Sequence, residues 1–137
     1  MPIIIDGWNF IRDDSSDIRD DETASLESAK TLISYLNDFQ ETHNDPIVLV
    51  FDSTHEYLDI SYINTAKLTV VPCRDADTYI KNYIEDTLDK QRRNIRVVSS
   101  DNDIYFFAKS YSATPMRCRE FWKKLRSGSQ GRDNGSS

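Results

Sequence analysis

Three hydrophobic runs in this sequence end in an aspartate. The segments IIID (3–6), IVLVFD (47–52) and IRVVSSD (95–101) place Asp6, Asp52 and Asp101 at the end of an apolar stretch, and Asp77 shortly follows a further run, LTVVP (68–72). Carboxylates that gather in one place repel one another unless protons or a cation intervene. These aspartates are therefore the residues whose type and repeated placement could do chemistry, if the fold brings them together.

An oxygen-only cluster of this kind suits a hard divalent cation, Mg²⁺ or Mn²⁺. The two histidines, His43 and His55, are expected in other loops, which disfavours zinc. Carboxylates that hold such an ion are typical of phosphodiester hydrolysis, in which the ion activates water and stabilises charge on the phosphate. The sequence predicts these metal ligands: Asp6, Asp52, Asp77, Asp101 and Asp103.

Several of these residues also have purely structural interpretations. The dipeptide Asp6–Gly7 can form a turn, in which glycine supplies unusual backbone angles and leaves room for a ligand. Asp75 is suited to cap a helix, and Asp77 would then lie in a first turn, where the helix dipole favours a negative charge. Asn9 can orient a carboxylate or a water molecule through its amide, which makes it a candidate catalytic residue.

The charge of the chain is unevenly distributed. The formal net charge is −6, but residues 1–72 hold 4 Lys or Arg against 14 Asp or Glu, whereas residues 73–137 hold 13 against 9. The basic second half can supply a phosphate-binding face, although an unevenly charged solvated surface explains it equally well. The candidate phosphate ligands are Arg74, Lys81, Arg117 and Arg119, of which Lys81 follows Asp77 by one helical turn.

Aromatic and sulfur side chains leave alternatives open. Trp8, Tyr79 and Trp122 could stack on nucleic-acid bases, but packing in the core is the more common role of such residues. Cys73 and Cys118 lie far apart without a metal-binding spacing, so we expect free thiols rather than a disulfide or a metal site.

Hydrophobic patterning predicts strands that alternate with helices. Continuous apolar runs predict strands at 2–6, 47–52, 68–72 and 95–100, with a candidate edge strand at ATPM (113–116). Apolar residues at three- and four-residue spacing predict helices from about Thr23 to the NDP of 44–46, from about Asp75 to Gln91, at 101–110, and at 117–126. The polar segment 12–22 is predicted to be a loop, and 57–65 is ambiguous, with a short helix as one interpretation.

This alternation favours an α/β fold with a parallel sheet and helices on both faces. In such sheets, sites form at the carboxyl ends of the strands, and neighbouring strands lie only about 4.8 Å apart. We therefore expect the aspartates that end the strands to meet at one edge of the sheet.

Length and composition predict one domain over residues 1–126, followed by a flexible Gly-, Ser- and Asn-rich tail at 127–137. The early apolar run is too short for a signal peptide, and no stretch approaches the roughly 20 apolar residues of a membrane span. We expect a soluble, cytoplasmic protein without membrane contact.

Five motifs in this order resemble a known family. The segments IIIDGWNFI, IVLVFD, DADTYIKNYIE, VVSSDND and REFWKKL resemble the NYN domains of the PIN-like nuclease superfamily, and among them the YacP-like branch. Trp8 stands where that branch usually has tyrosine, DAD stands where relatives often have TAD, and RCREF matches its segment loosely at the first positions. The resemblance covers about residues 2–126.

The resemblance implies a three-layer α/β/α PIN-like fold with a central, mainly parallel sheet. It implies a Mg²⁺- or Mn²⁺-dependent endoribonuclease, and some relatives act on mRNA in connection with the ribosome. Carried over by position, the implied residues are Asp6, Asp77 and Asp101 as core acids, Asn9 and Asp52 as supporting residues, and Asp103 as a fourth acid.

Two other functions remain open at this point. One is an RNA- or ribosome-binding module with a weakened PIN-like site. The other is a receiver-like phosphoacceptor domain, which usually needs paired acids after its first strand and a lysine after its last, whereas Asp6 is followed by Gly7 and no such lysine is evident. The acidic segment 12–22 should repel RNA, which leaves a protein partner or a basic ribosomal surface as its candidate contact. The sequence does not specify the RNA preference, the number of metal ions or the oligomeric state.

Overall fold

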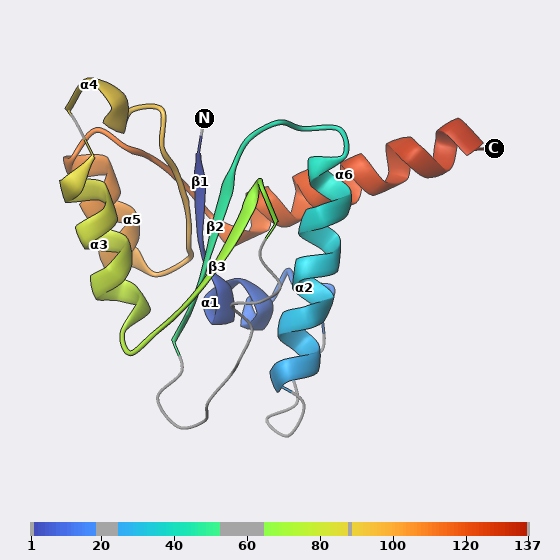
Figure 1. Cartoon of the computed structure of the whole chain (residues 1–137), viewed down its shortest axis with the longest axis horizontal. Helices are drawn as coiled ribbons and strands as arrows, with labels where there is room; N and C mark the ends of the chain where they lie inside the picture. Colours follow the sequence, from blue (N-terminus) through green and yellow to red (C-terminus); the bar gives the residue numbers. More distant parts are fainter. Residues whose placement is uncertain (1, 19–24, 53–64, 88, 137) are drawn as a thin grey trace.

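The computed structural model describes residues 2–18, 25–52, 65–87 and 89–136, in which strands alternate with helices along the chain (Figure 1). The elements are β1 (Ile3–Asp6), α1 (Gly7–Arg12), α2 (Ser25–Gln40), β2 (Ile47–Asp52), β3 (Leu68–Cys73), α3 (Ala76–Asp86), α4 (Asp89–Arg92), β4 (Arg96–Val98), α5 (Asn102–Ser110), β5 (Thr114–Met116) and α6 (Cys118–Ser136). The four predicted strands and the candidate edge strand are confirmed, with β4 shorter than predicted.

The five strands form one sheet in the order β3-β2-β1-β4-β5, and all of its neighbouring strands are parallel. The chain moves outward from β1 to β3 and then crosses back to place β4 on the other side of β1. Ligand sites in open α/β sheets form where the strand order reverses in this way, which here is between the carboxyl ends of β1 and β4. The order also differs from the 2-1-3-4-5 order of receiver-like folds, which argues against the phosphoacceptor interpretation.

The central strands lack hydrophobic alternation because helices cover both of their faces. Ile3, Ile4 and Ile5 are all fully buried, although their side chains point alternately to the two faces of the sheet. Ile3 and Ile5 belong to one hydrophobic cluster and Ile4 to a second one. The polar residue Asp6 ends the strand at the margin of this core.

The two hydrophobic clusters are the interfaces of a three-layer α/β/α arrangement, which confirms the predicted fold class. The first cluster joins the sheet to α1, α2 and α6 through residues such as Phe10, Leu32, Leu36, Phe121 and Trp122. The second joins the opposite face to α3 and α5 through Ala76, Ile80, Ile84, Ile104 and Ala108. Figure 1 shows α2 and α6 on one side of the strands and α3 and α5 on the other.

The start of the chain differs from the prediction, because Gly7 begins a helix instead of a turn. Its φ is not positive, so the expectation of unusual backbone angles is wrong. Glycine is required there for space. A Cβ atom on Gly7 would lie 2.6 Å from Cδ1 of Phe51 and 2.9 Å from the carbonyl oxygen of Val50. The close approach of α1 to β2 therefore depends on the missing side chain.

Helix ends account for the other differences. α2 ends at Gln40, before the predicted stop. The predicted helix from Asp75 to Gln91 is divided into α3 and α4, with Thr87 as the C-cap of α3. α6 continues beyond the predicted end at Arg126 to Ser136, and the flexibility of that segment stays a prediction. The ambiguous segment 57–65 lies outside the described residues except for Thr65. No helix in the described part of the chain is long and apolar enough to cross a membrane.

Candidate active site

The predicted acids come from different elements and meet at the carboxyl edge of the sheet. Asp6 ends β1 and Asp52 ends β2, while Asp101 is the N-cap of α5 and follows the last residue of β4, Val98, by three positions. Asp77 lies in the first turn of α3, and its charge acts on Asp6. Because β1 lies between β2 and β4, Asp6 is the central member of the group.

The electrostatics of Asp6 reflect the charges of the other acids at this edge. The pKa of Asp6 is raised from 3.8 to about 6, mainly by burial, and the charges of Asp101, Asp52 and Asp77 contribute to this rise in decreasing order. The backbone N–H of Asn9 acts in the opposite direction, although the Asp6 carboxylate makes no capping hydrogen bond at the start of α1. Asp6 is thus a carboxyl group held in an acidic, partly dehydrated position.

Two carboxylates in this group have an oxygen without a partner. Oδ1 of Asp52 and Oδ1 of Asp77 are buried, and neither accepts a hydrogen bond in the described part of the chain. A buried carboxylate oxygen without a partner is unfavourable, and native proteins usually supply a donor or an ion. No group of three or more His, Cys, Asp or Glu side chains among the described residues is close enough to be a ready-made metal site. The acids therefore share one edge of the sheet, but no three of the described ones converge on a common position for a metal ion.

Lys81 links two of the predicted acids. Its ammonium group lies 3.1 Å from Asp77 and also forms an ion pair with Asp103, which is exposed in the first turn of α5. The hydrogen bonds that Lys81 donates to Asp103 and Asp77 raise the pKa of its ammonium group. Asp103 thus joins the site through its ion pair with Lys81. The predicted proximity of Lys81 to Asp77 is confirmed.

The amide oxygen of Asn9 is bound within the protein, and the predicted role of its amide toward a carboxylate or water stays a prediction. Its Oδ1 accepts hydrogen bonds from the backbone N–H of Ser100 at 2.8 Å, from Oγ of Ser99 at 3.3 Å and from Sγ of Cys118 at 3.3 Å. The amide oxygen is fully used by the protein, so Asn9 fixes the turn that follows β4. Its Nδ2 group remains as the part of the side chain that could face a ligand.

Sequence reasoning missed Asp13, Ser100 and Cys118 as parts of this network. Ser100 Oγ lies 3.0 Å from Oδ1 of Asp13, and it also accepts the backbone N–H of Cys118 at 3.3 Å. A signal was present, because Asn9 and Asp13 are four residues apart and share one face if 7–12 is helical. This spacing has no meaning for a turn, which is what the dipeptide Asp6–Gly7 predicts.

The predicted phosphate ligands occupy different positions. Arg117 lies directly before α6, where it donates to Oδ1 of Asn102 at 2.9 Å and to the carbonyl of Ser100 at 3.3 Å, and it covers the ring of Tyr105. This places a guanidinium group beside the Asp101 turn. Arg119 is exposed in the first turn of α6, and Arg74 is exposed between β3 and α3. Of these arginines, Arg117 is the one that hydrogen bonds place beside the site, next to Ser100 and Asn102.

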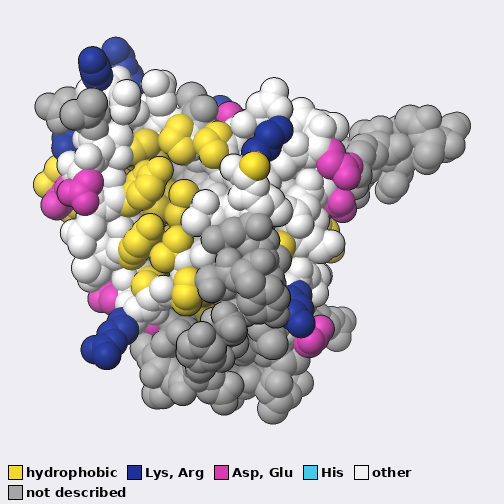
Figure 2. All heavy atoms as spheres, in the orientation of Figure 1, with side chains coloured by type: hydrophobic (Ala, Val, Ile, Leu, Met, Phe, Trp, Pro, Cys, Tyr) yellow, Lys and Arg dark blue, Asp and Glu magenta, His cyan; other side chains and the backbone are white. Residues whose placement is uncertain are grey.

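The aromatic candidates are mostly part of the core. Trp122 is fully buried and stacks on Phe10 with ring centroids 4.4 Å apart, so it cannot contact a base in this structure. Trp8 packs on Phe51 and donates from Nε1 to the carbonyl of Asp52 at 2.6 Å. Tyr79 packs against the second cluster, and Figure 2 shows hydrophobic side chains gathered beside α3 on the face of the molecule seen there.

Both cysteines are free, as expected. Cys118 is fully buried beside Asn9, and burial raises the pKa of its thiol to about 12. Burial likewise raises the pKa of the partly buried Cys73. Neither thiol has the character of a nucleophile.

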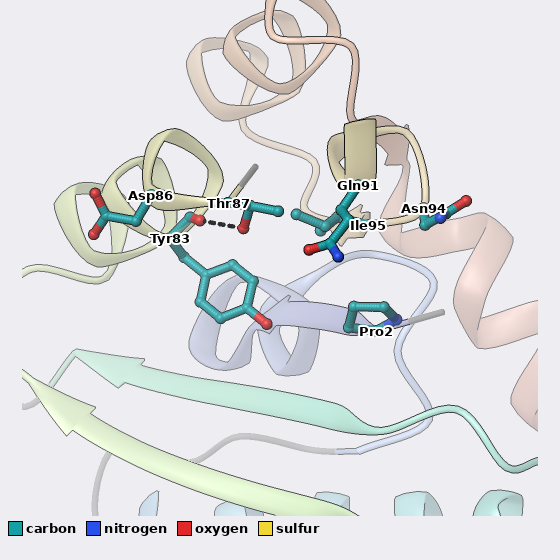
Figure 3. A pocket seen from close by; sticks show the side chains of 7 residues that line it. All are labelled: Pro2, Tyr83, Asp86, Thr87, Gln91, Asn94 and Ile95. Atoms are coloured by element: carbon teal, nitrogen blue, oxygen red, sulfur yellow. Dashed lines mark hydrogen bonds between the residues drawn. The ribbon is translucent and has the colours of Figure 1, made fainter. Parts of the chain in front are cut away.

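A pocket of about 560 Å³ lies at the opposite end of the sheet (Figure 3). It lies near the amino ends of β1 and β4, because Pro2 and Ile95 directly precede these strands. Its lining residues are Pro2, Tyr83, Asp86, Thr87, Gln91, Asn94 and Ile95. None of the predicted site residues is among them, so this pocket is separate from the acidic edge.

Fold and sequence together define an NYN domain, a nuclease-type domain with an RNA-related function. The profile of the family described as the YacP-like NYN domain matches residues 3–135, and the chain belongs to this family. This confirms the branch that the sequence motifs suggested. The match also includes most of the segment that was predicted to be a tail.

Solved structures agree with this assignment at the level of the fold. Rae1 (YacP) from Bacillus subtilis superposes with a TM-score of 0.71 at 16% identity, covering 99% of this chain and 79% of that one. A point mutant of the same protein gives a TM-score of 0.74 at 16% identity, covering 97% and 79%. Among proteins with curated descriptions, none is significantly similar in sequence.

Proposed function

We propose that this protein is a metal-dependent endoribonuclease that hydrolyses phosphodiester bonds of RNA at the acidic edge of the sheet. The observation that carries the proposal is the state of the central acids. Asp6 has a pKa of about 6 because it is buried beside three other carboxylates, and Asp52 and Asp77 each keep a buried oxygen without a partner. A divalent cation would relieve both conditions at once.

The donor set fits Mg²⁺ or Mn²⁺, which prefer carboxylate oxygens. Asp6, Asp77 and Asp101 would hold the ion, with Asp52 and Asp103 as further oxygen ligands. When bound, such an ion supplies an activated water molecule and charge stabilisation at the phosphate. Within the chain itself, Lys81 offsets the charges of Asp77 and Asp103, and its ion pairs keep α3 and α5 in register at the site.

Substrate positioning falls to the basic residues at the rim. Arg117 is oriented by Asn102 and by the carbonyl of Ser100, so its guanidinium is held beside the Asp101 turn. Arg119, Arg74 and Lys81 are further cationic groups that could contact phosphates on either side of the acids. Contacts of this kind position a nucleic acid without reading its sequence. We extend the proposal to mRNA in connection with the ribosome, in the cytoplasm, supported by the motif resemblance to the YacP-like branch.

The test is RNA cleavage by the purified protein with Mn²⁺, with Mg²⁺ and with EDTA. We expect cleavage only with metal. Asp77→Asn should lower the rate by about a hundredfold or more while the fold survives, because mutating even the residues that merely orient metal ligands costs about 10- to 100-fold. Asp75→Asn is the matched control. Asp75 caps the same helix through Thr78 and is fully exposed, and asparagine caps equally well. Unchanged cleavage by Asp77→Asn would contradict the assignment.

A second function is favoured by the ion pairs of Lys81 and by the lack of a ready-made metal group among the described residues. In this alternative, the protein is an RNA- or ribosome-binding module whose PIN-like site is weakened. It predicts RNA binding in EDTA that equals binding in Mn²⁺, without turnover in either. A filter-binding assay on the same RNA, run beside the cleavage assay, distinguishes the two functions.

A further inference from the structure

Asp13, the first acid of the acidic segment 12–22, points into the protein instead of toward solvent. Its Oδ1 accepts a hydrogen bond from Oγ of Ser100 at 3.0 Å. Its Oδ2 accepts from the backbone N–H of Ser15 at 3.0 Å and from the Ser15 hydroxyl. Although partial burial acts to raise it, these hydrogen bonds lower the pKa of Asp13 below its usual value, aided by the charge of Arg119. Asp13 is therefore an ionised acceptor with both oxygens engaged.

Ser100, the partner of Asp13, is the residue directly before the site acid Asp101. Its backbone N–H donates to Asn9 at 2.8 Å, and its hydroxyl accepts the backbone N–H of Cys118 at 3.3 Å. β4 already ends at Val98, so the ladder between β1 and β4 does not hold this turn. The backbone N–H of Ser99 still donates to the carbonyl of Met116 at 3.1 Å. Beyond Ser99, side-chain hydrogen bonds to Ser100 and its neighbours help to set the position of Asp101 relative to Asp6.

The rest of the described part of this segment is attached to α6. Nη1 of Arg126 lies 3.1 Å from the carbonyl of Ser15 and 3.1 Å from Oδ1 of Asp17. Ile18 is buried in the first hydrophobic cluster. Residues 13–18 are therefore packed against the domain, and Asp13 belongs to a segment that these contacts hold in place.

The structure assigns to Asp13 the role of a positioning residue that, through Ser100, holds Asp101 in place beside Asp6. This assignment rests on the proposed function, since Asp101 matters there as a ligand of the divalent ion. Asp13 does not itself belong to the ligand group, because both of its oxygens are used within the protein. Residues that orient metal ligands in this indirect way typically change metal affinity or activity by about 10- to 100-fold when they are removed.

The test compares Asp13→Ala with Asp13→Asn and with the control Asp14→Ala. Asparagine keeps an oxygen that can accept from the Ser100 hydroxyl, whereas alanine does not. Asp14 is the next residue in the chain, it is exposed, and its side chain has no hydrogen bond or ion pair with the described residues. The readouts are binding of Mn²⁺ alone, followed by the electron paramagnetic resonance of the free ion, and amide hydrogen exchange at Ser100 and Cys118.

We expect Asp13→Ala to weaken Mn²⁺ binding about tenfold and to speed exchange at the amides of Ser100 and Cys118, while amides of β1 and β2 exchange at wild-type rates. Asp13→Asn should recover most of the affinity, and Asp14→Ala should match the wild type. Wild-type affinity and exchange in Asp13→Ala would overturn the assignment, and so would faster exchange throughout the sheet, which would indicate a merely structural role.

Two further outcomes are separable. If Asp13→Ala does not fold, Ser100→Ala removes the same hydrogen bond from the other side and should give the same local exchange and the same loss of affinity. If the wild-type protein does not bind Mn²⁺, the proposed function fails, and the exchange comparison still decides whether Asp13 holds the Asp101 turn.

Discussion

Replacing Asp6 with asparagine should stabilise the metal-free protein at neutral pH. The pKa of Asp6 is about 6 in the folded protein because of burial and neighbouring carboxylates, compared with 3.8 for an ordinary aspartate. The folded state therefore binds a proton more tightly than the unfolded chain does. It follows that ionisation of Asp6 opposes folding: the cost is absent well below pH 3.8 and complete above about pH 6.

The magnitude follows from the separation between these two pKa values. One pH unit corresponds to about 1.4 kcal/mol, so the full cost is about 3 kcal/mol at pH 7.5 and falls to about 1 kcal/mol at pH 4.5. Asparagine does not ionise and is free of this cost. The free energy of unfolding of Asp6→Asn minus that of the wild type should therefore increase by about 2 kcal/mol between pH 4.5 and pH 7.5.

Urea unfolding in EDTA at pH 4.5, 6 and 7.5 measures this difference. Asp14→Asn is the control, because Asp14 is exposed and its difference from the wild type should not follow the same course. A difference between Asp6→Asn and the wild type that stays constant with pH would refute the reasoning, since it would mean that Asp6 is not held in an acidic, buried position.

The same substitution should also reduce the stabilisation of the protein by metal binding. Excess Mn²⁺ at pH 7.5 should stabilise the wild type by an amount that grows with concentration, about 2.7 kcal/mol at 100 times the Kd. Asp6→Asn should gain much less, because a central ligand is lost. Equal stabilisation of both proteins would place the ion elsewhere.

Three further predictions concern packing and the thiols. Gly7→Ala should lower the free energy of unfolding by about 1–3 kcal/mol, because the added methyl group meets the Phe51 ring and the Val50 carbonyl; an unchanged urea midpoint would contradict the packing argument. Trp122→Ala should cost about 3–5 kcal/mol, because the indole is fully buried and donates to the carbonyl of Phe10 at 2.9 Å; loss of RNA binding at full stability would instead restore the base-stacking interpretation. Iodoacetamide at pH 8 should leave Cys118 unmodified in the native protein and react with it in urea, as followed by mass spectrometry, because the thiol is buried and its pKa is about 12; equal rates in both conditions would show that the α6 terminus opens readily.

The strands and their order along the chain could be predicted because they depend on local patterns. β1 and β2 are continuous apolar runs, and such runs form strands buried on both faces. The helix that starts at Asp75 was recognisable from its cap, whose carboxylate accepts the N–H of Thr78. α1 was missed because "DG" is a common turn dipeptide, and the feature that decides against a turn is the contact of Gly7 with Phe51, far away in the sequence.

The candidate acids were also visible in the sequence, since each follows an apolar run or a helix start. Their grouping around Asp6 was an inference from the parallel sheet, and the raised pKa of Asp6 supports it. The role of Asn9 was not predictable, because its three donors come from Ser99, Ser100 and Cys118, and the last of these is the first residue of α6.

The sequence by itself determined which segments become the strands and the longer helices, and that a carboxylate follows three of the apolar runs. Those properties follow from side-chain hydrophobicity and spacing within a few residues. Only the tertiary structure decided that β4 returns to the side of β1, which sets Asp101 beside Asp6, and that Asp13 turns inward to Ser100. The physical reason is that these placements depend on contacts between residues about 90 positions apart, which no local pattern encodes.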